Sequence, residues 1–343
     1  MWLPGKQNTT EKTELMGTDG AFRCLIVDEM HESLLPMLAG IGVEGDYRPG
    51  IAAGEIGGVL AAGGYGGLIV RSKIFVSGEL LRRAPGLRVV CRAGAGVDNV
   101  DEAALAAAGV ELINAPEGNR DAVGEFCVGL LLGLLRYIPR AHAEVGRGEW
   151  RREANRGTEL GNLTVGIIGF GHMGEAFARR LSGFGCEVIA CDLFPEKINA
   201  SLARPVRLEE LQNSSDVISL HVPLTTTTRR MVNASWLAAC TREVWLLNTS
   251  RGEVVDTGAL VGALRAGRVR GAALDVLENE RLGTLTPAQA ADLAYLQQHP
   301  RVVLTPHIAG WTTDSYERIN RVLVSKLERF VKAREGCPDF KFS

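Results

Sequence analysis

The chain has 343 residues, more than one hydrophobic core usually organises, so we expect two domains with a ligand-binding cleft between them. Its formal net charge of −2 and pI near 6.3 supply no broad basic surface, which excludes nucleic acid and an anionic membrane as main partners. The seven cysteines are odd in number and form no Cys-x-x-Cys motif, a pattern that favours reduced thiols in a cytoplasmic protein.

Two segments could be mistaken for membrane signals. Residues 1–20 are polar and lack the apolar run of a secretory signal, so we expect a disordered tail there. The most apolar segment, Val123 to Leu135, contains Glu125, ends at Arg136 and is shorter than the ~20 residues that span a membrane. We therefore predict a buried or subunit-contacting helix around Asp121–Arg136 and no membrane partner.

The first domain is predicted from short Val/Ile/Leu-rich runs that alternate with helical stretches. The predicted strands are Arg23–Asp28, Val43–Tyr47, Gly67–Arg71, Leu87–Cys91 and Val110–Asn114. Strands that alternate with helices favour a parallel sheet covered on both faces.

A second series of six strands follows, separated by helices such as Thr257–Arg265. These strands are Thr164–Gly169, Glu187–Cys191, Val217–His221, Val244–Asn248, Gly271–Asp275 and Val302–Thr305. The fold class is therefore α/β, with two doubly wound parallel-sheet domains: a Rossmann domain and a smaller flavodoxin-like domain. A last helix near Ser315–Lys332 has no sheet of its own left to cover and is expected to pack back on the first domain. We place the first domain at 21–114 and 306–343 and the Rossmann domain at 115–305.

A cofactor motif begins at the end of the first Rossmann strand. Gly169, Gly171 and Gly174 form Gly-x-Gly-x-x-Gly, followed by the helix-like segment Glu175–Leu181. The three glycines permit a tight turn, a close approach of the pyrophosphate to the backbone, and close packing of helix on strand. The loop, with His172 and Met173, is expected to hold a dinucleotide diphosphate at the helix N-terminus, with His172 as a bystander to the chemistry. Gly94-Ala95-Gly96 is a near-match, but its third position is Asn99.

Asp192 strengthens the interpretation of the glycine motif as a dinucleotide-binding site. It ends the next strand, 23 residues after Gly169, where a carboxylate accepts hydrogen bonds from the adenosine ribose and repels a 2′-phosphate. The predicted cofactor is NAD rather than NADP.

Chemically capable residues follow nearly every Rossmann strand. In an open parallel sheet the ligand lies outside the carboxyl ends of the strands, so residues far apart in sequence are expected to meet in one crevice. They are Gly169, Asp192, His221, Arg251, the Asp275–Glu280 pair and His307. We interpret the chain as an enzyme.

Several segments resemble the D-2-hydroxyacid dehydrogenase family, in the family's order and over nearly the whole chain beyond the tail. Besides the glycine motif they are 92–101 (RAGAGVDNVD), 221–224 (HVPL), 248–252 (NTSRG), 273–276 (ALDV) with Glu280, and 305–307 (TPH). The resemblance implies NAD-linked interconversion of a 2-hydroxy acid and a 2-keto acid, with Arg251, Glu280 and His307 as catalysts.

The chemistry supports the same three residues. A histidine suits proton exchange with a hydroxyl, and a carboxylate behind it fixes its tautomer, although Glu278 lies close to Glu280 in sequence and stays an alternative. An arginine fork binds a carboxylate and stabilises charge on the neighbouring carbonyl.

Further contacts are implied by the resemblance. Residues expected to contact the cofactor, besides the glycine loop and Asp192, are Val123, His221, Pro223, Asn248, Ser250 and Asp275, with Asn119 near the nicotinamide. The turn Gly94, Ala95, Gly96 and Val97 offers backbone amides for the substrate carboxylate, and Arg71 and Ser72 are expected at its distal end. We expect no metal site.

Within the family the chain looks most like short-form D-3-phosphoglycerate dehydrogenase, which implies oxidation of 3-phosphoglycerate in serine biosynthesis, with Arg71 and Lys73 suiting a phosphate. Glycerate or hydroxypyruvate, lactate and erythronate-4-phosphate enzymes share the same catalysts and stay open as alternatives. A different class is an NAD(H)-sensing binding protein, because the family includes corepressors of the C-terminal-binding-protein type. A homodimer through the segment after Asn119 is also expected.

Overall fold

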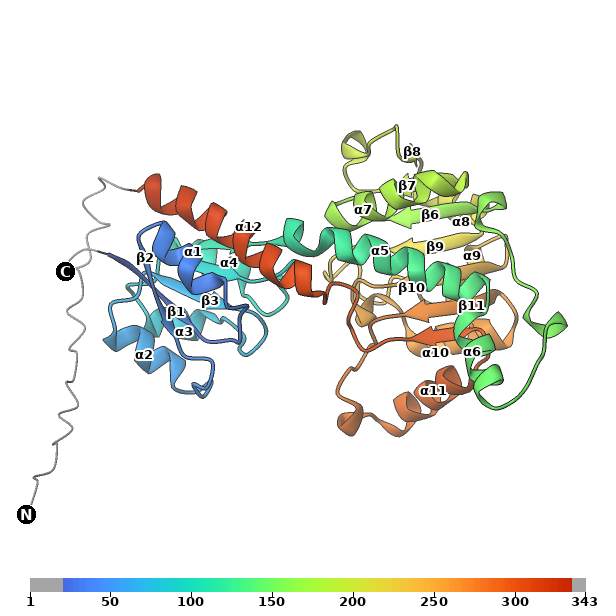
Figure 1. The fold of residues 1–343 in the computed structure, drawn as a ribbon, viewed down its shortest axis with the longest axis horizontal. Coiled ribbons are helices and arrows are strands. Elements are labelled where there is room, and N and C mark those ends of the chain that lie inside the picture. The colour runs from blue at the N-terminus through green and yellow to red at the C-terminus, as the bar shows by residue number, and fades with distance from the viewer. Residues whose placement is uncertain (1–20, 335–343) are drawn as a thin grey trace, which may run out of the picture. The chain divides into compact units, whose positions relative to one another are not determined.

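The computed structural model describes residues 21–334, which divide into two compact units (Figure 1). Unit 1 comprises the described residues up to Cys91, Asp101–Ile113, and those from Val324 onward; unit 2 comprises Arg92–Val100 and Asn114–Leu323. The expected tail at 1–20 and Cys337 lie outside the described residues. Residues 92–100, 114 and 306–323 group with unit 2, whereas the sequence predicts them in the first domain. The functions assigned to the two domains stay predictions.

Unit 1 is built on a five-stranded sheet in the order β2-β1-β3-β4-β5, the flavodoxin-like order. Its strands are β1 Phe22–Ile26, β2 Val43–Tyr47, β3 Gly67–Val70, β4 Val89–Arg92 and β5 Glu111–Asn114. Its helices are α1 Leu34–Gly40, α2 Ile56–Ala62, α3 Gly78–Arg83 and α4 Glu102–Ala108. Strand β1 pairs in parallel with β2 and β3, as buried apolar strands in an α/β domain do.

The last helix, α12 Thr313–Lys332, begins in unit 2 and ends in unit 1. Its C-terminal half packs in unit 1, where Phe330 meets Phe22 of β1 edge to face, with ring centroids 6.1 Å apart. This part of the helix covers the first domain, as the sequence predicts.

Unit 2 carries a seven-stranded sheet in the order β8-β7-β6-β9-β10-β11-β12, and every pair is parallel. The strands are β6 Thr164–Ile168, β7 Glu187–Cys191, β8 Arg204–Pro205, β9 Val217–Leu220, β10 Val244–Asn248, β11 Val269–Leu274 and β12 Val302–Leu304. The order is the Rossmann order with a seventh strand, and it reverses between β6 and β9. The six predicted strands are confirmed; β8, a two-residue edge strand, is an addition.

Helices cover both faces of this sheet. They are α5 Pro116–Leu135, α6 Ile138–Gly146, α7 His172–Leu181, α8 Leu208–Ser214, α9 Ala234–Ala239, α10 Thr257–Arg265 and α11 Pro287–Gln298. One core joins α5 and α7 to one face, with Val165 and Ile167 of β6 pointing into it. A second core joins α8–α11 to the other face, into which Ile168 points. The strand ends that carry the site are thus held by two apolar layers.

Within residues 21–334, no single helix is long and apolar enough to cross a membrane; only α5 and α6 taken together pass on length and composition, and the pair is bent by 62°.

Candidate active site

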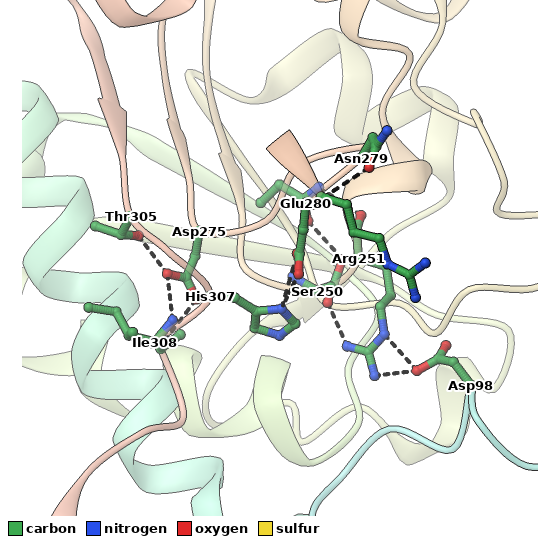
Figure 2. A network of polar contacts seen from close by, with 12 residues as sticks. Asp98, Ser250, Arg251, Asp275, Asn279, Glu280, Thr305, His307 and Ile308 are labelled. Atoms are coloured by element: carbon green, nitrogen blue, oxygen red, sulfur yellow. Dashed lines mark hydrogen bonds and ion pairs between the residues drawn. The ribbon is translucent and has the colours of Figure 1, made fainter. Parts of the chain in front are cut away.

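His307 and Glu280 form the centre of the site (Figure 2). His307 Nδ1 lies 3.0 Å from Glu280 Oε1 and 3.1 Å from Oε2, and both side chains are about half exposed. Because an ionised carboxylate only accepts hydrogen bonds, Nδ1 carries the proton in this contact. Nε2 is therefore the nitrogen left to exchange a proton with a ligand.

The loop that carries His307 is organised by Asp275, which follows β11. The Asp275 carboxylate is buried and accepts hydrogen bonds from Thr305 Oγ1 at 2.5 Å, the Ile308 amide at 3.0 Å and the Ala309 amide at 2.8 Å. The amide of His307 donates to the Asp275 carbonyl at 2.8 Å, and His307 holds a φ of 56°. Such a conformation is uncommon outside glycine and persists where the surroundings over-determine it. Asp275 thus holds the backbone of the loop that carries the imidazole.

Glu278, the alternative partner for the histidine, faces another residue. Glu278 Oε1 accepts from Arg230 Nε at 2.9 Å, and Oε2 accepts from the Thr257 amide at 3.3 Å. Its side chain is 14% exposed, against 46% for Glu280. The structure therefore pairs Glu280, and not Glu278, with His307.

Arg251 stands on the loop after β10, and that loop is shaped by Asn248. Asn248 Oδ1 accepts from the amide and hydroxyl of Ser250, and Nδ2 donates to the Arg251 carbonyl at 2.9 Å. The guanidinium in turn donates from Nη1 to the Ser250 carbonyl at 2.6 Å, and from Nε and Nη2 to Asp98 Oδ2. Asn248 and Ser250 thus hold the arginine in place; their expected contact with the cofactor stays a prediction.

The Arg251 loop and the Glu280 loop approach each other at Gly252. A Cβ built on Gly252 would lie 1.9 Å from the Leu277 carbonyl oxygen and 2.5 Å from the Glu278 amide nitrogen. Only glycine allows this approach, which places the arginine near the histidine–glutamate pair.

The charges at the site act on one another. The hydrogen bond that His307 donates to Glu280 raises the pKa of His307, while burial and the charge of Arg251 act against that increase. The same hydrogen bond lowers the pKa of Glu280, assisted by the nearby charges of His307 and Arg251. The pair therefore favours a charged imidazolium beside an ionised carboxylate.

The glycine loop has the geometry that the motif predicts. Gly169 holds a φ of +90°, and a Cβ on Gly174 would lie 2.1 Å from the Gly169 carbonyl oxygen. Helix α7 follows directly, with Gly171 at its N-cap position and no side chain capping its first amides. Open amides at the start of a ten-residue helix suit a diphosphate.

Asp192 faces the same loop. Its Oδ2 accepts from the Phe170 amide at 2.6 Å and its Oδ1 from the Phe194 amide at 2.9 Å. Each carboxylate oxygen can accept a further hydrogen bond, so the residue can shape the loop and still bind ribose hydroxyls.

Other expected cofactor residues lie near the point where the strand order reverses. His221 follows β9, its Nε2 lies 2.8 Å from Ser219 Oγ, and burial lowers its pKa to about 4, so it stays neutral near pH 7. Its carbonyl oxygen would lie 2.6 Å from a Cβ on Gly169, which brings the Pro223 loop beside the glycine loop. Met173 packs against the α5–α7 core, Val123 is buried within it, and His172 is exposed.

The expected substrate residues fall in both units. The turn from Gly94 to Val97 belongs to unit 2; its Gly94 and Ala95 carbonyls accept from the Ala115 amide and from Asn114 Nδ2. Arg71 and Ser72 follow β3 in unit 1, where the Arg71 amide donates to Asp28 Oδ2 at 2.6 Å.

Sequence reasoning missed three residues that build the site: Asp98, Arg230 and Gly252. Asp98 stands 153 positions from the arginine it contacts, and Arg230 stands 48 positions from Glu278. The position of Gly252 directly after Arg251 was a usable signal. In the described part of the chain, no three His, Cys, Asp or Glu side chains are grouped as metal ligands, and the six described cysteines are free thiols.

Known proteins resemble this chain over the segment that carries the site. Residues 128–309 match the family model of the D-isomer specific 2-hydroxyacid dehydrogenase, NAD binding domain. The chain is 37% identical over 270 residues to D-3-phosphoglycerate dehydrogenase of Sus scrofa, covering 78% of this chain and 49% of that protein. It is 36% identical over 261 residues to hydroxypyruvate reductase of Thermotoga maritima, covering 76% and 83%. This chain thus spans about half the length of the phosphoglycerate dehydrogenases that it matches.

A solved structure gives the same result. D-lactate dehydrogenase from Aquifex aeolicus, complexed with NAD and lactic acid, superposes with a TM-score of 0.78 at 26% identity, covering 93% of this chain and 98% of that one. The Rossmann strand order, the glycine loop and the matched segment identify NAD as the cofactor. The chain belongs to the D-isomer specific 2-hydroxyacid dehydrogenase family.

Proposed function

We propose that this protein is an NAD-dependent oxidoreductase that interconverts a D-2-hydroxy acid and its 2-keto acid. The observation that carries the proposal is the meeting of Arg251, Glu280 and His307 at the carboxyl edge of one NAD-binding sheet, with His307 Nδ1 3.0 Å from Glu280. NAD, when bound, supplies the hydride acceptor.

His307 serves as the acid and base in this proposal. In oxidation, neutral Nε2 takes the hydroxyl proton, and the resulting imidazolium is stabilised by Glu280. In reduction the imidazolium returns that proton to the carbonyl oxygen. The hydrogen bond to Glu280 raises the pKa of His307, which favours the imidazolium that reduction needs.

Arg251 binds the acid. A guanidinium donates along two parallel N–H bonds, which matches a carboxylate beside a polarised carbonyl. The amides of the Gly94–Val97 turn lie in the same unit and are proposed to hold the other side of the carboxylate.

The residues present fit NAD. The Gly169–Gly174 loop would hold the diphosphate, since its Cβ-free positions leave the backbone accessible and α7 presents open amides. Asp192 would hold the adenosine ribose and exclude a 2′-phosphate.

For the substrate we propose 3-phosphoglycerate, which the relatives named D-3-phosphoglycerate dehydrogenase support. Relatives named for hydroxypyruvate and lactate make those acids the alternatives. Of the two cations expected to meet a phosphate, Lys73 donates from Nζ to the carbonyls of Pro49 and Ile51, and Arg71 donates from Nη1 to the Glu29 carbonyl at 3.3 Å. Part of the hydrogen-bonding capacity of Lys73 is thus already used.

The test is oxidation of NADH, followed by fluorescence, with 3-phosphohydroxypyruvate, hydroxypyruvate, pyruvate and glyoxylate. We expect turnover of at least one acid, with the highest kcat/KM for the phosphorylated one. Tight NADH binding without turnover of any acid would instead support the sensing protein, the second class of function. A preference for an unphosphorylated acid would contradict only the proposed substrate, 3-phosphoglycerate, and not the reaction class.

We also propose a homodimer. Helix α5 is largely buried within unit 2, and exposed apolar side chains follow it in sequence, where Ile138 is 56%, Val145 53% and Trp150 83% exposed. We propose that these side chains contribute to the partner surface, because large apolar surfaces that stay exposed often mark protein–protein contacts. Light scattering should give twice the chain mass, and a monomer at micromolar concentration would contradict the proposal.

A further inference from the structure

The contact between Asp98 and Arg251 is unusual for an anion-binding site. Arg251 Nε lies 2.7 Å and Nη2 2.5 Å from Asp98 Oδ2, so a carboxylate of the protein already sits on the guanidinium (Figure 2). A negative charge there repels a carboxylate ligand. We therefore expect the Asp98 carboxylate to have a function that outweighs this repulsion.

The hydrogen bonds show what the contact does. A guanidinium has five N–H donors. Asp98 takes one from Nε and one from Nη2, and the Ser250 carbonyl takes one from Nη1. Among residues 21–334, two donors are left without a partner, one on each terminal nitrogen, and two such donors are what a bidentate carboxylate requires.

The chain makes room for this arrangement at Gly96. A Cβ on Gly96 would lie 1.5 Å from Arg251 Nη2 and 2.8 Å from Asp98 Oδ2. The guanidinium therefore lies directly over the backbone of the 92–100 segment, between the turn and Asp98. All these residues belong to unit 2.

We propose that Asp98 is a positioning residue, which holds Arg251 by its Nε edge so that the two remaining donors face the substrate's carboxylate and carbonyl. The inference rests on the proposed function and deepens it by adding a residue that acts only through Arg251. In the described part of the chain, Asp98 accepts hydrogen bonds from Arg251, whereas His307 pairs with Glu280, so the proton exchange does not pass through Asp98.

The experiment compares Asp98→Ala and Asp98→Asn with the wild type in complex with NADH. The first readout is the Kd of oxamate, an inert 2-keto acid analogue, by NADH fluorescence; the second is kcat/KM for the best keto acid. Asp98→Ala should weaken oxamate and lower kcat/KM by about 10- to 100-fold, the range that a misplaced binding group gives. Asp98→Asn keeps an acceptor oxygen, so its oxamate Kd and its kcat/KM should lie between those of Asp98→Ala and the wild type. NADH affinity should not change.

The matched control is Glu243→Gln, which removes the charge from an exposed ion pair with Arg270 Nε at 3.1 Å. Its oxamate Kd should equal that of the wild type. A general loosening of the fold would lower kcat without moving the oxamate Kd, so the Kd separates positioning from stability.

Two results would overturn the inference: oxamate binding that is unchanged in Asp98→Ala, or binding that becomes tighter, which would make Asp98 a competitor of the substrate. A wild type that turns over no keto acid, yet binds oxamate in an Asp98-dependent way, would reject the proposed reaction and leave the positioning role intact. A wild type that neither turns over keto acids nor binds oxamate would reject both.

Discussion

Gly252→Ala tests whether the close approach of two loops creates the site. The added Cβ would lie 1.9 Å from the Leu277 carbonyl oxygen, and real Cβ contacts essentially never fall below 3.0 Å, so the loops must separate by about 1.1 Å. Both contact atoms nearest the new methyl group are backbone, so no flexible side chain can absorb the shift. Arg251 moves with one loop and Glu280 with the other. A misplacement of about 1 Å in a catalytic arrangement costs on the order of 10²-fold in rate.

The assay is kcat/KM for NADH oxidation by the best keto acid, with NADH affinity and thermal unfolding measured alongside. We expect a loss of about 10²-fold in kcat/KM, with NADH affinity retained. The control is Gly262→Ala in α10, where a Cβ meets nothing within 4 Å and an alanine stabilises a helix by roughly 0.5–1 kcal/mol. A folded Gly252→Ala protein with wild-type kcat/KM would refute the reasoning, because the loops would then tolerate separation.

The remaining predictions concern proton exchange and cofactor choice. His307→Ala should lower kcat by about 10² to 10⁴ with NADH binding retained, and an unchanged kcat would remove its assignment as acid and base. Keto-acid reduction needs the imidazolium, so its rate should fall as the pH rises through the raised pKa of His307; in Glu280→Gln this fall should move to lower pH, and a profile that stays in place would contradict the pairing. Asp192→Ala removes the acceptor of the Phe170 and Phe194 amides and should raise the KM for NADH by about 10-fold or more, while NADPH gains relative to NADH. Equal KM values for NADH in variant and wild type would exclude that role.

Much of the fold could be predicted because its signals are local. Most of the predicted strands are short apolar runs. In unit 2, successive residues of such a strand point into different cores, as β6 shows with Ile167 on one side and Ile168 on the other. Strand β8 was missed because Arg204–Pro205 is polar, two residues long and ends in proline, which sheets accept at an edge.

The site was predictable residue by residue, but its contacts were not. Strand ends and motifs indicated Arg251, Glu280 and His307. The choice between Glu278 and Glu280 depended on Arg230, which binds Glu278, and no local sequence pattern connects Arg230 to either glutamate. Asp275 binds the loop that follows β12 through three hydrogen bonds that no local pattern indicates, and its expected contact with the cofactor stays a prediction. Such contacts arise from the packing of segments that are distant in sequence, and the periodicity of apolar residues does not predict them.

The order in which unit 1 is completed has a consequence for synthesis of the chain. Phe22, among the first described residues to leave the ribosome, is covered by Phe330 of α12, among the last. The Phe22 ring, which is buried in the folded protein, therefore stays exposed to water until all of unit 2 has been translated. During that interval the nascent protein carries an apolar side chain that lacks its final partner, and exposed apolar surface of this kind favours aggregation.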